Sequence, residues 1–152
     1  MASMDATSRR VGSVRILIVD DFGPWRQKVC LILEPQKKLQ VVGEASDGLE
    51  AVQKGKDLKP DLILLDIGLP GLNGIEAVDR ICEVAPAPKI LFLSQNNQAD
   101  VVRAALRTGA QGYVLKTDAG SELVSAIEAV LRGDQFVSSG LSGEDFLDAT
   151  EA

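Results

Sequence analysis

Short apolar segments alternate with amphipathic segments five times along the chain, a pattern that predicts an α/β fold. Most of the apolar segments are unbroken and rich in Ile, Leu and Val, as expected for strands that are covered on both faces. They occupy residues 15–19, 41–45, 62–65, 90–93 and 112–115. Five strand–helix units in this order favour parallel pairing with right-handed crossovers, so we expect helices on both faces of the sheet.

The segments between and after the strands carry apolar residues at positions i, i+3, i+4 and i+7, the spacing of one buried helix face. Local signals agree with these helices. Asp47 and Asn73 each stand three residues before a glutamate, the arrangement of a capping box at a helix N-terminus. Gly109 and Gly133 follow two of the helical segments, and we expect them to end those helices because glycine tolerates the left-handed backbone found there.

A length of 152 residues fits one domain of ordinary size. The alternating pattern covers residues 14–133, and the polar stretch 1–13 before it predicts a flexible N-terminal segment. After residue 133 the pattern fades into small, polar and acidic residues. Residues 134–152 are therefore expected to form a C-terminal extension or linker that is mobile towards its end.

Composition argues against several classes of function. The chain has no histidine, which excludes histidine general bases and zinc sites built on imidazole. Aromatic residues make up 4% and the net charge is −6, so we expect no direct nucleic-acid binding by this chain. No apolar stretch reaches the length of a membrane span, and residues 1–13 lack the apolar region of a secretory signal. We therefore expect a cytoplasmic protein without membrane contact.

The two cysteines give no sign of a disulfide or a metal site. Cys30 and Cys82 fall inside helical segments on apolar stripes, and the chain has no CxxC pair. Each is therefore interpreted as a buried, reduced thiol that acts as a small hydrophobic residue.

Charged residues follow three of the predicted strands. Asp20 and Asp21 follow the first strand, Asp66 the third and Lys116 the fifth. Because the carboxyl ends of parallel strands meet at one edge of the sheet, we expect these side chains to lie together. Two like charges 4 Å apart repel by about 4 kcal/mol at an effective dielectric constant near 20, so three crowded carboxylates need a cation. The pattern predicts an acidic pocket suited to a hard divalent metal and a phosphoryl group.

These segments resemble the receiver domain of two-component response regulators. The resemblance covers about residues 14–133, and residues 65–74 look most like regulators of the NarL/FixJ type. It implies a flavodoxin-like (βα)5 doubly wound sandwich with a parallel five-stranded sheet in the order 2-1-3-4-5. The matching segments are Ile18-Val19-Asp20-Asp21, residues 61–74, Leu93-Ser94 and Gly112-Tyr113-Val114-Leu115-Lys116.

The resemblance implies a role for each residue of the acidic pocket. Asp66 is expected to be the phosphoacceptor and a direct ligand of Mg²⁺. Asp21 is expected to be a second direct ligand, Asp20 a ligand through water, and the Gly68 carbonyl a backbone ligand. Mg²⁺ suits these positions because it takes oxygen ligands, keeps several waters and bridges carboxylate and phosphoryl oxygens.

Three further residues complete the site and its readout. Lys116 is expected to pair with Asp66 and then with a phosphoryl oxygen, a movement that suits a compact ammonium on a flexible stem. Ser94 is expected to hydrogen-bond the new phosphoryl group. Tyr113 is expected to be half-buried at rest. Tyr113 would turn inward on phosphorylation. This movement would transmit the phosphorylation state to the surface formed by the fourth helix, the fifth strand and the fifth helix.

Three positions need separate comment. Gln95 stands where receivers usually have a small Ala or Gly, and we expect it to restrict access and slow phosphoryl gain, loss or both. Thr117 replaces the proline that often follows the lysine, so we assume no cis peptide bond there. Asp61, just before its strand, is interpreted as a turn or helix cap with no part in the chemistry.

The resemblance also implies the partners. A sensor histidine kinase or a histidine phosphotransfer protein is expected to donate the phosphoryl group, because this chain has no histidine of its own. A homodimer on phosphorylation is possible. Regulators of the NarL/FixJ type usually continue into a helix-turn-helix domain, whereas this chain stops at Ala152. The chain is either a single-domain receiver or one separated from such a domain within the linker.

Three alternatives share the expected fold. An aspartate-nucleophile phosphatase would carry a second acid at position 68, which is glycine, so we expect a switch and not an enzyme that acts on other substrates. A flavodoxin-like cofactor binder would need hydroxyl and glycine donors in the loop 20–25, which is acidic. An interaction module independent of phosphorylation would not need the full set of charged residues described above.

Overall fold

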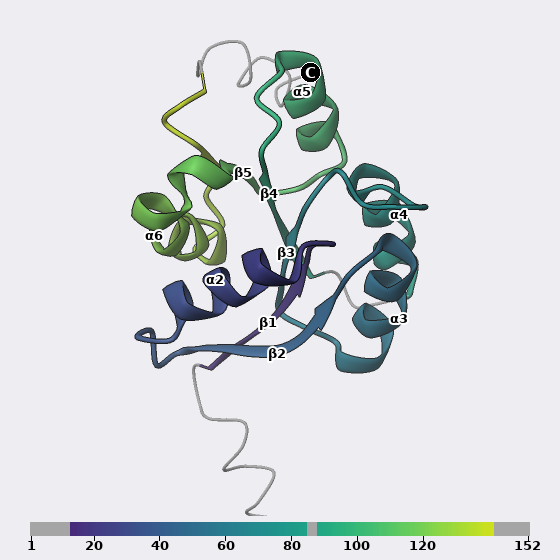
Figure 1. Ribbon diagram of the computed structural model, residues 1–152, viewed down its shortest axis with the longest axis horizontal. Coiled ribbons are helices and arrows are strands. Elements are labelled where there is room, and N and C mark those ends of the chain that lie inside the picture. Colours follow the sequence, from purple (N-terminus) through teal and green to yellow (C-terminus); the bar gives the residue numbers. More distant parts are fainter. Residues whose placement is uncertain (1–12, 85–87, 142–152) are drawn as a thin grey trace, which may run out of the picture.

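The computed structural model describes residues 13–84 and 88–141. A parallel six-stranded sheet lies at its centre, in the order β2-β1-β3-β4-β5-β6 (Figure 1). The order expected for the first five strands is confirmed, and β6 adds a strand beside β5. The strands are β1 Val14–Val19, β2 Leu39–Ala45, β3 Leu62–Leu65, β4 Lys89–Ser94, β5 Gly112–Leu115 and β6 Phe136–Val137.

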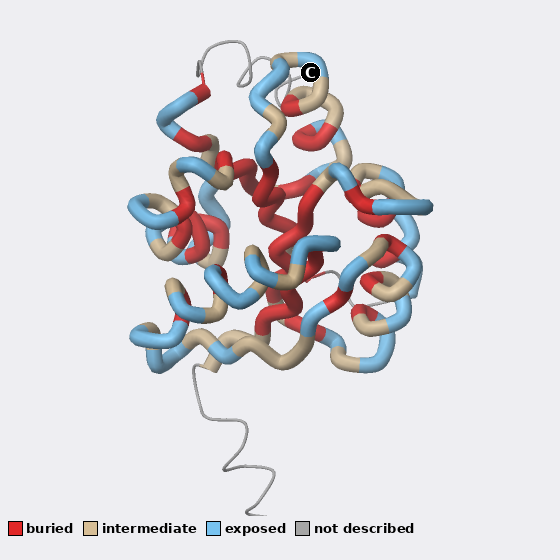
Figure 2. The backbone as a smooth tube through the Cα atoms, viewed as in Figure 1, coloured by how far each residue is buried: buried red, intermediate tan, exposed pale blue. Residues whose placement is uncertain are grey.

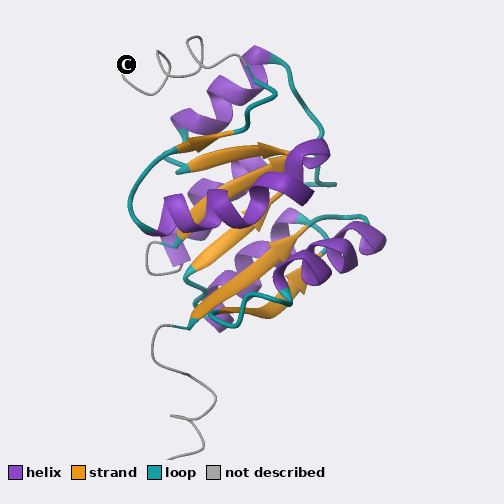
Figure 3. Cartoon of the chain, turned by 90° about the vertical axis from the view of Figure 1, so that its left-hand side faces the viewer, coloured by secondary structure: helices purple, strands orange, loops and turns teal. Residues whose placement is uncertain are grey.

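Helices cover both faces of the sheet (Figures 1 and 3). Two of them, α2 and α6, pack on one face, and α3, α4 and α5 pack on the other. A short 3-10 turn, η1, links β5 to α6. The helices are α2 Gly23–Leu33, α3 Gly48–Leu58, α4 Gly74–Val84, α5 Ala99–Arg107 and α6 Ala119–Leu131, and η1 covers Lys116–Asp118.

Each central strand sends alternate side chains into two hydrophobic cores. In β1, Leu17 and Val19 enter the core beneath α3, α4 and α5, whereas Ile16 and Ile18 enter the core beneath α2 and α6. All four residues of β3 are buried, and the buried positions follow the middle of the sheet in Figure 2. The unbroken apolar strands are thus explained by burial on both faces.

Both predicted capping boxes are present. In the one at the start of α3, the glutamate side chain accepts the amide one residue before the N-cap. At the start of α4, the Glu76 amide donates to Asn73 Oδ1 (2.9 Å) and the Asn73 amide donates to Glu76 Oε1 (3.1 Å). At the start of α3, the Glu50 amide donates to Asp47 Oδ1 (2.7 Å), but Glu50 Oε1 accepts from the Ser46 amide (2.7 Å). Reciprocal bonds of this kind satisfy amides that have no partner within the helix.

The predicted helix ends at Gly109 and Gly133 are confirmed. Their φ angles are 95° and 94°, in the left-handed region, and they follow α5 and α6. The cysteine prediction is wrong in part, because Cys82 is exposed and Cys30 is only partly buried. Cys82 follows the buried Ile81 in α4, and a step of one residue around a helix turns its side chain towards solvent.

Residues 134–141 belong to the folded body, and we call them the C-terminal strap. The Ser138 amide donates to the Tyr113 carbonyl (2.9 Å), continuing the pairing of β6 with β5. Leu141 is buried in the same core as Tyr113. The expected extension therefore begins with an ordered strand. The expected flexible segment, residues 1–13, lies outside the described part except for Ser13, and no described helix has the length and apolar character needed to cross a membrane.

Candidate functional site

Three carboxylates meet at the carboxyl edge of the sheet. Strands β1 and β3 are parallel neighbours with Val19 opposite Leu65, so the residues that follow them, Asp20 and Asp66, emerge side by side. Asp20, Asp21 and Asp66 each offer an oxygen within 4.8 Å of the others. Asp20 is 1% exposed and Asp66 is 7% exposed, whereas Asp21 faces solvent. Strand register therefore brings together the acids that the sequence pattern singled out.

Lys116 lies against this cluster, closer to Asp20 than to Asp66. Its Nζ is 2.6 Å from Asp20 Oδ2 and 3.5 Å from Asp66 Oδ2. Asp20 Oδ1 accepts the Phe22 amide (2.9 Å), while Oδ2 has no described hydrogen-bond partner apart from the lysine. Asp66 is partly satisfied by the Ile67 amide, which donates to its Oδ1 (2.8 Å). The expected pair of Lys116 with Asp66 is present, and the lysine also forms a shorter ion pair with the buried Asp20.

The electrostatic balance of the site is unfavourable to Asp66. Burial raises the pKa of its carboxyl above the usual value, and the charge on Asp20 adds to that effect, while Lys116 and the Ile67 amide oppose it. In the described part of the chain, Lys116 is the one cation paired with this cluster of three carboxylates, and its ion pairs are with Asp20 and Asp66. The cluster therefore has more negative charge than Lys116 can neutralise, which favours a bound cation.

The donor set fits a magnesium ion. All three side chains offer carboxylate oxygens, the ligands preferred by hard divalent cations. Asp20 Oδ2 is buried and its neutralisation rests on one lysine, which is the kind of atom that a cation would relieve. Gly68 lines the same pocket without a side chain, so its backbone is accessible from the pocket.

One open pocket of about 660 Å³ connects the predicted residues. Sequence reasoning did not assign Phe22, Trp25 or Asn96, which also line it. A further unassigned residue is Arg26, whose Nη1 donates to the Asp20 carbonyl (2.6 Å) and whose Nε donates to Glu44 (2.8 Å), holding the acidic loop in place. The six predicted residues at this pocket are Asp20, Asp21, Asp66, Gly68, Ser94 and Lys116.

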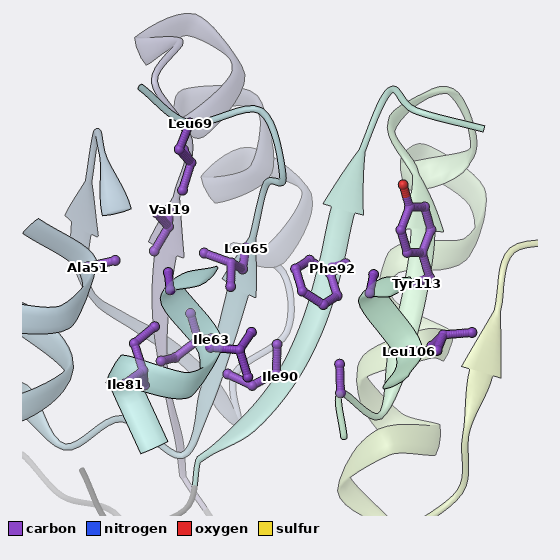
Figure 4. Packing of buried hydrophobic residues seen from close by; sticks show 14 of the residues in the cluster. Val19, Ala51, Ile63, Leu65, Leu69, Ile81, Ile90, Phe92, Leu106 and Tyr113 are labelled. Atoms are coloured by element: carbon purple, nitrogen blue, oxygen red, sulfur yellow. The ribbon is translucent and has the colours of Figure 1, made fainter. Parts of the chain in front are cut away.

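Ser94 and Tyr113 meet at the loop between β4 and α5. The Asn96 amide donates to Ser94 Oγ (3.1 Å), and the Tyr113 hydroxyl donates to the Asn96 carbonyl (2.6 Å). Tyr113 is 0% exposed, so the expectation of a half-buried ring is wrong. Val137 and Leu141 of the C-terminal strap belong to the same core as Tyr113, and Figure 4 shows the ring beside Phe92 with its hydroxyl directed away from the core. Burial raises the pKa of Tyr113 to about 12, and the charge on Asp66 contributes less, while a hydrogen bond with Ser94 acts in the opposite direction.

A comparison with known families decides the identity. The family model described as the response regulator receiver domain matches residues 16–128. The chain belongs to this family. Its place among receivers of the NarL type is supported by two curated relatives. They are the transcriptional regulatory protein LiaR of Bacillus subtilis, 37% identical over 86% of this chain and 62% of LiaR, and the nitrate/nitrite response regulator protein NarL of Escherichia coli K12, 35% identical over 84% of this chain and 59% of NarL.

Solved receiver structures agree with this assignment. A two-component response regulator of the LuxR family from Aurantimonas sp. SI85-9A1 is similar with a TM-score of 0.79 and 32% identity, over 91% of this chain and 96% of that one. The receiver described here spans about 60% of the length of the curated relatives it matches.

The expectation of no direct nucleic-acid binding by this chain is contradicted by its relatives. LiaR is named as a transcriptional regulatory protein. A structure of the response regulator RcsB in complex with DNA is similar to this receiver, with a TM-score of 0.77 and 25% identity over 91% of this chain and 68% of RcsB. The expectation came from the charge and aromatic content of this chain, which do not report on the DNA that a relative such as RcsB binds.

The remaining expectations concern residues around the receiver's pocket. Gln95 is exposed and lines the pocket next to Ser94. Among the described residues no peptide bond is cis, so Thr117 follows Lys116 through a trans bond. Asp61 acts structurally, because its Oδ2 accepts the Arg15 amide (2.8 Å) at the start of β1.

A close contact fixes the main chain of Asp66. A Cβ atom added to Gly74, the first residue of α4, would lie 2.0 Å from the Asp66 carbonyl oxygen. The Gly74 amide donates to the Ile67 carbonyl (2.9 Å). The helix therefore begins directly against the loop that presents Asp66, and only glycine allows that approach.

Proposed function

We propose that this receiver accepts a phosphoryl group on Asp66 from a sensor histidine kinase or a histidine phosphotransfer protein, with Mg²⁺ bound, and does not act on other substrates as an enzyme. The observation that carries the proposal is the position of Lys116, 2.6 Å from Asp20 and 3.5 Å from Asp66 inside one open pocket. A cation beside two buried carboxylates suits a site where a further anion arrives.

The proposed transfer needs no residue beyond those at the pocket. A carboxylate oxygen of Asp66 attacks phosphorus, and a P–O bond forms as the P–N bond of the donor phosphohistidine breaks. The leaving nitrogen keeps the electron pair, and the donor departs as neutral imidazole when its other ring nitrogen carries a proton, while Asp66 becomes an acyl phosphate. Lys116 is close enough to Asp66 to bind a phosphoryl oxygen after a small movement. Ser94, 3% exposed and at the end of β4, is placed to donate its hydroxyl to another.

The residues that would hold the metal are Asp21 and Asp66 directly, Asp20 through water and the Gly68 carbonyl. Bound Mg²⁺ offsets the charge of the carboxylates and of the incoming phosphoryl oxygens. Asp20 and Asp66 are held by the ends of adjacent strands, so the site needs little rearrangement before binding.

The proposed output is a change on the surface formed by α5, β5 and α6. Asn96 connects the chemistry to this surface, because its amide bonds Ser94 and its carbonyl accepts the Tyr113 hydroxyl. If Ser94 moves towards a phosphoryl group, the loop that contains Asn96 moves with it. Tyr113 then changes its contacts at the edge of the sheet, and a difference of a few kcal/mol between the two arrangements is enough for a switch.

The domain limits and the setting of the receiver belong to the same proposal. We propose a receiver domain over residues 14–133, followed by an extension or linker over residues 134–152 whose first part is the C-terminal strap. The relatives suggest that this receiver serves in the control of transcription, since LiaR is called a transcriptional regulatory protein. A cytoplasmic location remains part of the proposal and rests on the family alone.

The test is phosphorylation by a small donor. Incubation with acetyl phosphate and Mg²⁺ is expected to add one phosphoryl group, measured by intact mass. Asp66→Asn is expected to take none, and EDTA is expected to abolish the gain. Asp61→Asn is the matched control, because Asp61 is an aspartate near the opposite end of β3 that bonds the Arg15 amide. A phosphoryl group on Asp66→Asn, or steady turnover of an aryl phosphate by the unchanged protein, contradicts the proposal.

A further inference from the structure

Trp25 lies beside the lysine of the site and has no role in the proposed chemistry. It is the third residue of α2, and it lines the same pocket as Asp20, Asp66 and Lys116. The Lys116 Nζ lies 5.3 Å from the centre of the Trp25 ring. An ammonium within about 6 Å of the centre of an aromatic ring is attracted by the ring's negative face, and tryptophan gives the strongest attraction.

The ring is held where it is by contacts outside the pocket. Trp25 packs against the core beneath α2 and α6, with other partly buried apolar residues of α2. Pro24 lies in the first turn of the helix, where its restricted backbone favours the helical path. The position of Trp25 is therefore set by the helix and the core beneath it as well as by its contact with the lysine.

The burial of Lys116 strengthens the contact. The lysine side chain is 11% exposed, so the ammonium is largely removed from water, and a cation–π contact gains strength when the cation is desolvated. Lys28 also places its Nζ over Trp25, at 5.4 Å from the ring centre, but Lys28 is exposed. Of these two lysines, Lys116 is the one for which the ring replaces lost hydration.

We propose that Trp25 is a positioning residue that seats Lys116 in the pocket, and this inference rests on the proposed function. The carboxylate partners of Lys116 change during the proposed reaction, because Asp66 becomes an acyl phosphate and Asp20 would help to hold the metal. Trp25 carries no charge and keeps the same attraction for Lys116 throughout. The ring holds the ammonium beside Asp66 when its ion pairs weaken.

A graded series at position 25 tests this seat. Trp25→Phe keeps a ring and Trp25→Leu removes it while retaining apolar bulk. The rate of phosphorylation by acetyl phosphate is expected to fall in the order tryptophan, phenylalanine, leucine, with about a three- to tenfold loss for leucine. Lys28→Gln removes the other cation over the ring and is expected to leave the rate unchanged. Thermal unfolding of each variant checks that the fold is retained.

A double substitution separates a positioning role from a structural one. In the Lys116→Met background, Trp25→Leu is expected to cause no further loss of rate, because there is no ammonium left to seat. An equal fractional loss with and without Lys116 overturns the proposal, and so does an unchanged rate in Trp25→Leu.

A measurement without phosphoryl donor or metal provides the second readout. The ε-methylene protons of Lys116 are expected to resonate upfield in the unchanged protein because of the Trp25 ring, to remain so in Lys28→Gln, and to move downfield in Trp25→Leu. If the proton shifts of Lys116 do not differ between the unchanged protein and Trp25→Leu, the proposed positioning role of Trp25 is wrong, whatever the phosphorylation rates. If the unchanged protein takes up no phosphoryl group, the proposed function fails, while these proton shifts still decide whether Trp25 holds Lys116.

Discussion

Two pairs of carboxylates near the carboxyl edge of the sheet are satisfied in different ways. In the pocket, Asp20 and Asp66 share Lys116, and each accepts one described amide. At the start of α6, Asp118 and Glu122 share the Ser138 hydroxyl, at 2.5 and 2.9 Å. The Ser139 amide adds a bond to Glu122 (3.2 Å), and so does the Ser139 hydroxyl.

This difference distinguishes the carboxylates of the pocket, which can bind a ligand, from those that attach the C-terminal strap, which are structural. Neutral hydroxyl and amide donors attach the C-terminal strap to α6 without using a cation. In the pocket a buried lysine serves two carboxylates, and the pKa of Asp66 is raised because burial disfavours its charged form. Negative charge that the fold leaves poorly compensated is available for a ligand, whereas carboxylates with neutral donors contribute to packing.

The largest effect is expected when the substitution of Asp66 is compared with the substitution of Asp118. Asp66→Asn is expected to abolish phosphoryl acceptance while leaving the free energy of unfolding at pH 7 unchanged or higher, because it removes a buried charge. Asp118→Asn is expected to keep acceptance and lower the stability. Intact mass after acetyl phosphate treatment and urea unfolding measure both quantities. The comparison fails if Asp66→Asn is the less stable of the two.

The sign of the pH dependence follows from the same charge. The pKa of Asp66 is raised in the folded state by burial, so the folded protein holds the proton to a higher pH than the unfolded chain. Its contribution to stability is present below the unfolded pKa and is lost as the pH rises through the folded pKa. In Asp66→Asn, the free energy of unfolding is expected not to show the decline with rising pH that Asp66 causes.

Tyr113 connects the pocket with the C-terminal strap, and its ionisation is expected to have the next largest effect on stability. Its hydroxyl bonds Asn96 beside the pocket, and its carbonyl accepts the Ser138 amide of the C-terminal strap. Its pKa is raised from 10.0 to about 12, mainly by burial, so stability is expected to be present below pH 10 and to fall by about 2–3 kcal/mol as the pH rises through 12.

The chain has a single tyrosine, so phenolate absorbance reports this group alone. Urea unfolding at several alkaline pH values, compared with Tyr113→Phe, isolates its contribution from that of the lysines. Ionisation near pH 10 in the folded protein contradicts the buried position of the ring.

Removal of the hydroxyl at position 138 is expected to have a smaller effect, confined to the scaffold. Ser138→Ala is expected to lower the free energy of unfolding by about 1–2 kcal/mol, because it leaves Asp118 and Glu122 without a shared donor. Phosphoryl acceptance is expected to remain unchanged. Ser139→Ala, at an exposed position, is the milder control, and an equal loss in both variants contradicts a special role for the buried hydroxyl.

Gln95→Ala is expected to have the smallest effect and to act only in the pocket. Removing this side chain from the pocket is expected to speed phosphoryl gain, loss or both by a few-fold, equivalent to about 0.5–1 kcal/mol in the barrier. The two rate constants are measured separately, by uptake from acetyl phosphate and by decay after its removal. Equal rates in the unchanged protein and in the variant contradict the expectation.

The scaffold of the pocket could be predicted because strand ends obey simple rules. Asp20 and Asp66 follow adjacent parallel strands in register, so the positions of the acids in the sequence already implied their meeting in space. The capping box at Asn73 is equally local and was found in full. Such features depend on a few neighbouring residues or on one pairing rule.

The features that sequence reasoning missed depend on contacts between distant segments. Strand β6 has only two residues, Phe136 and Val137, too few for a periodic pattern. Without that strand the full burial of Tyr113 could not be anticipated. Trp25 fits the sequence pattern as one more apolar position of a helix, and only the folded chain places its ring beside Lys116, which follows β5.

The contact of Gly74 with the Asp66 carbonyl has a consequence for genetics. Any side chain at position 74 would push the first turn of α4 away from the loop that carries Asp66, the proposed acceptor. A screen for alleles that no longer respond to their stimulus should therefore recover substitutions at this glycine. They are expected to impair the proposed phosphorylation without altering any group proposed to contact the phosphoryl group.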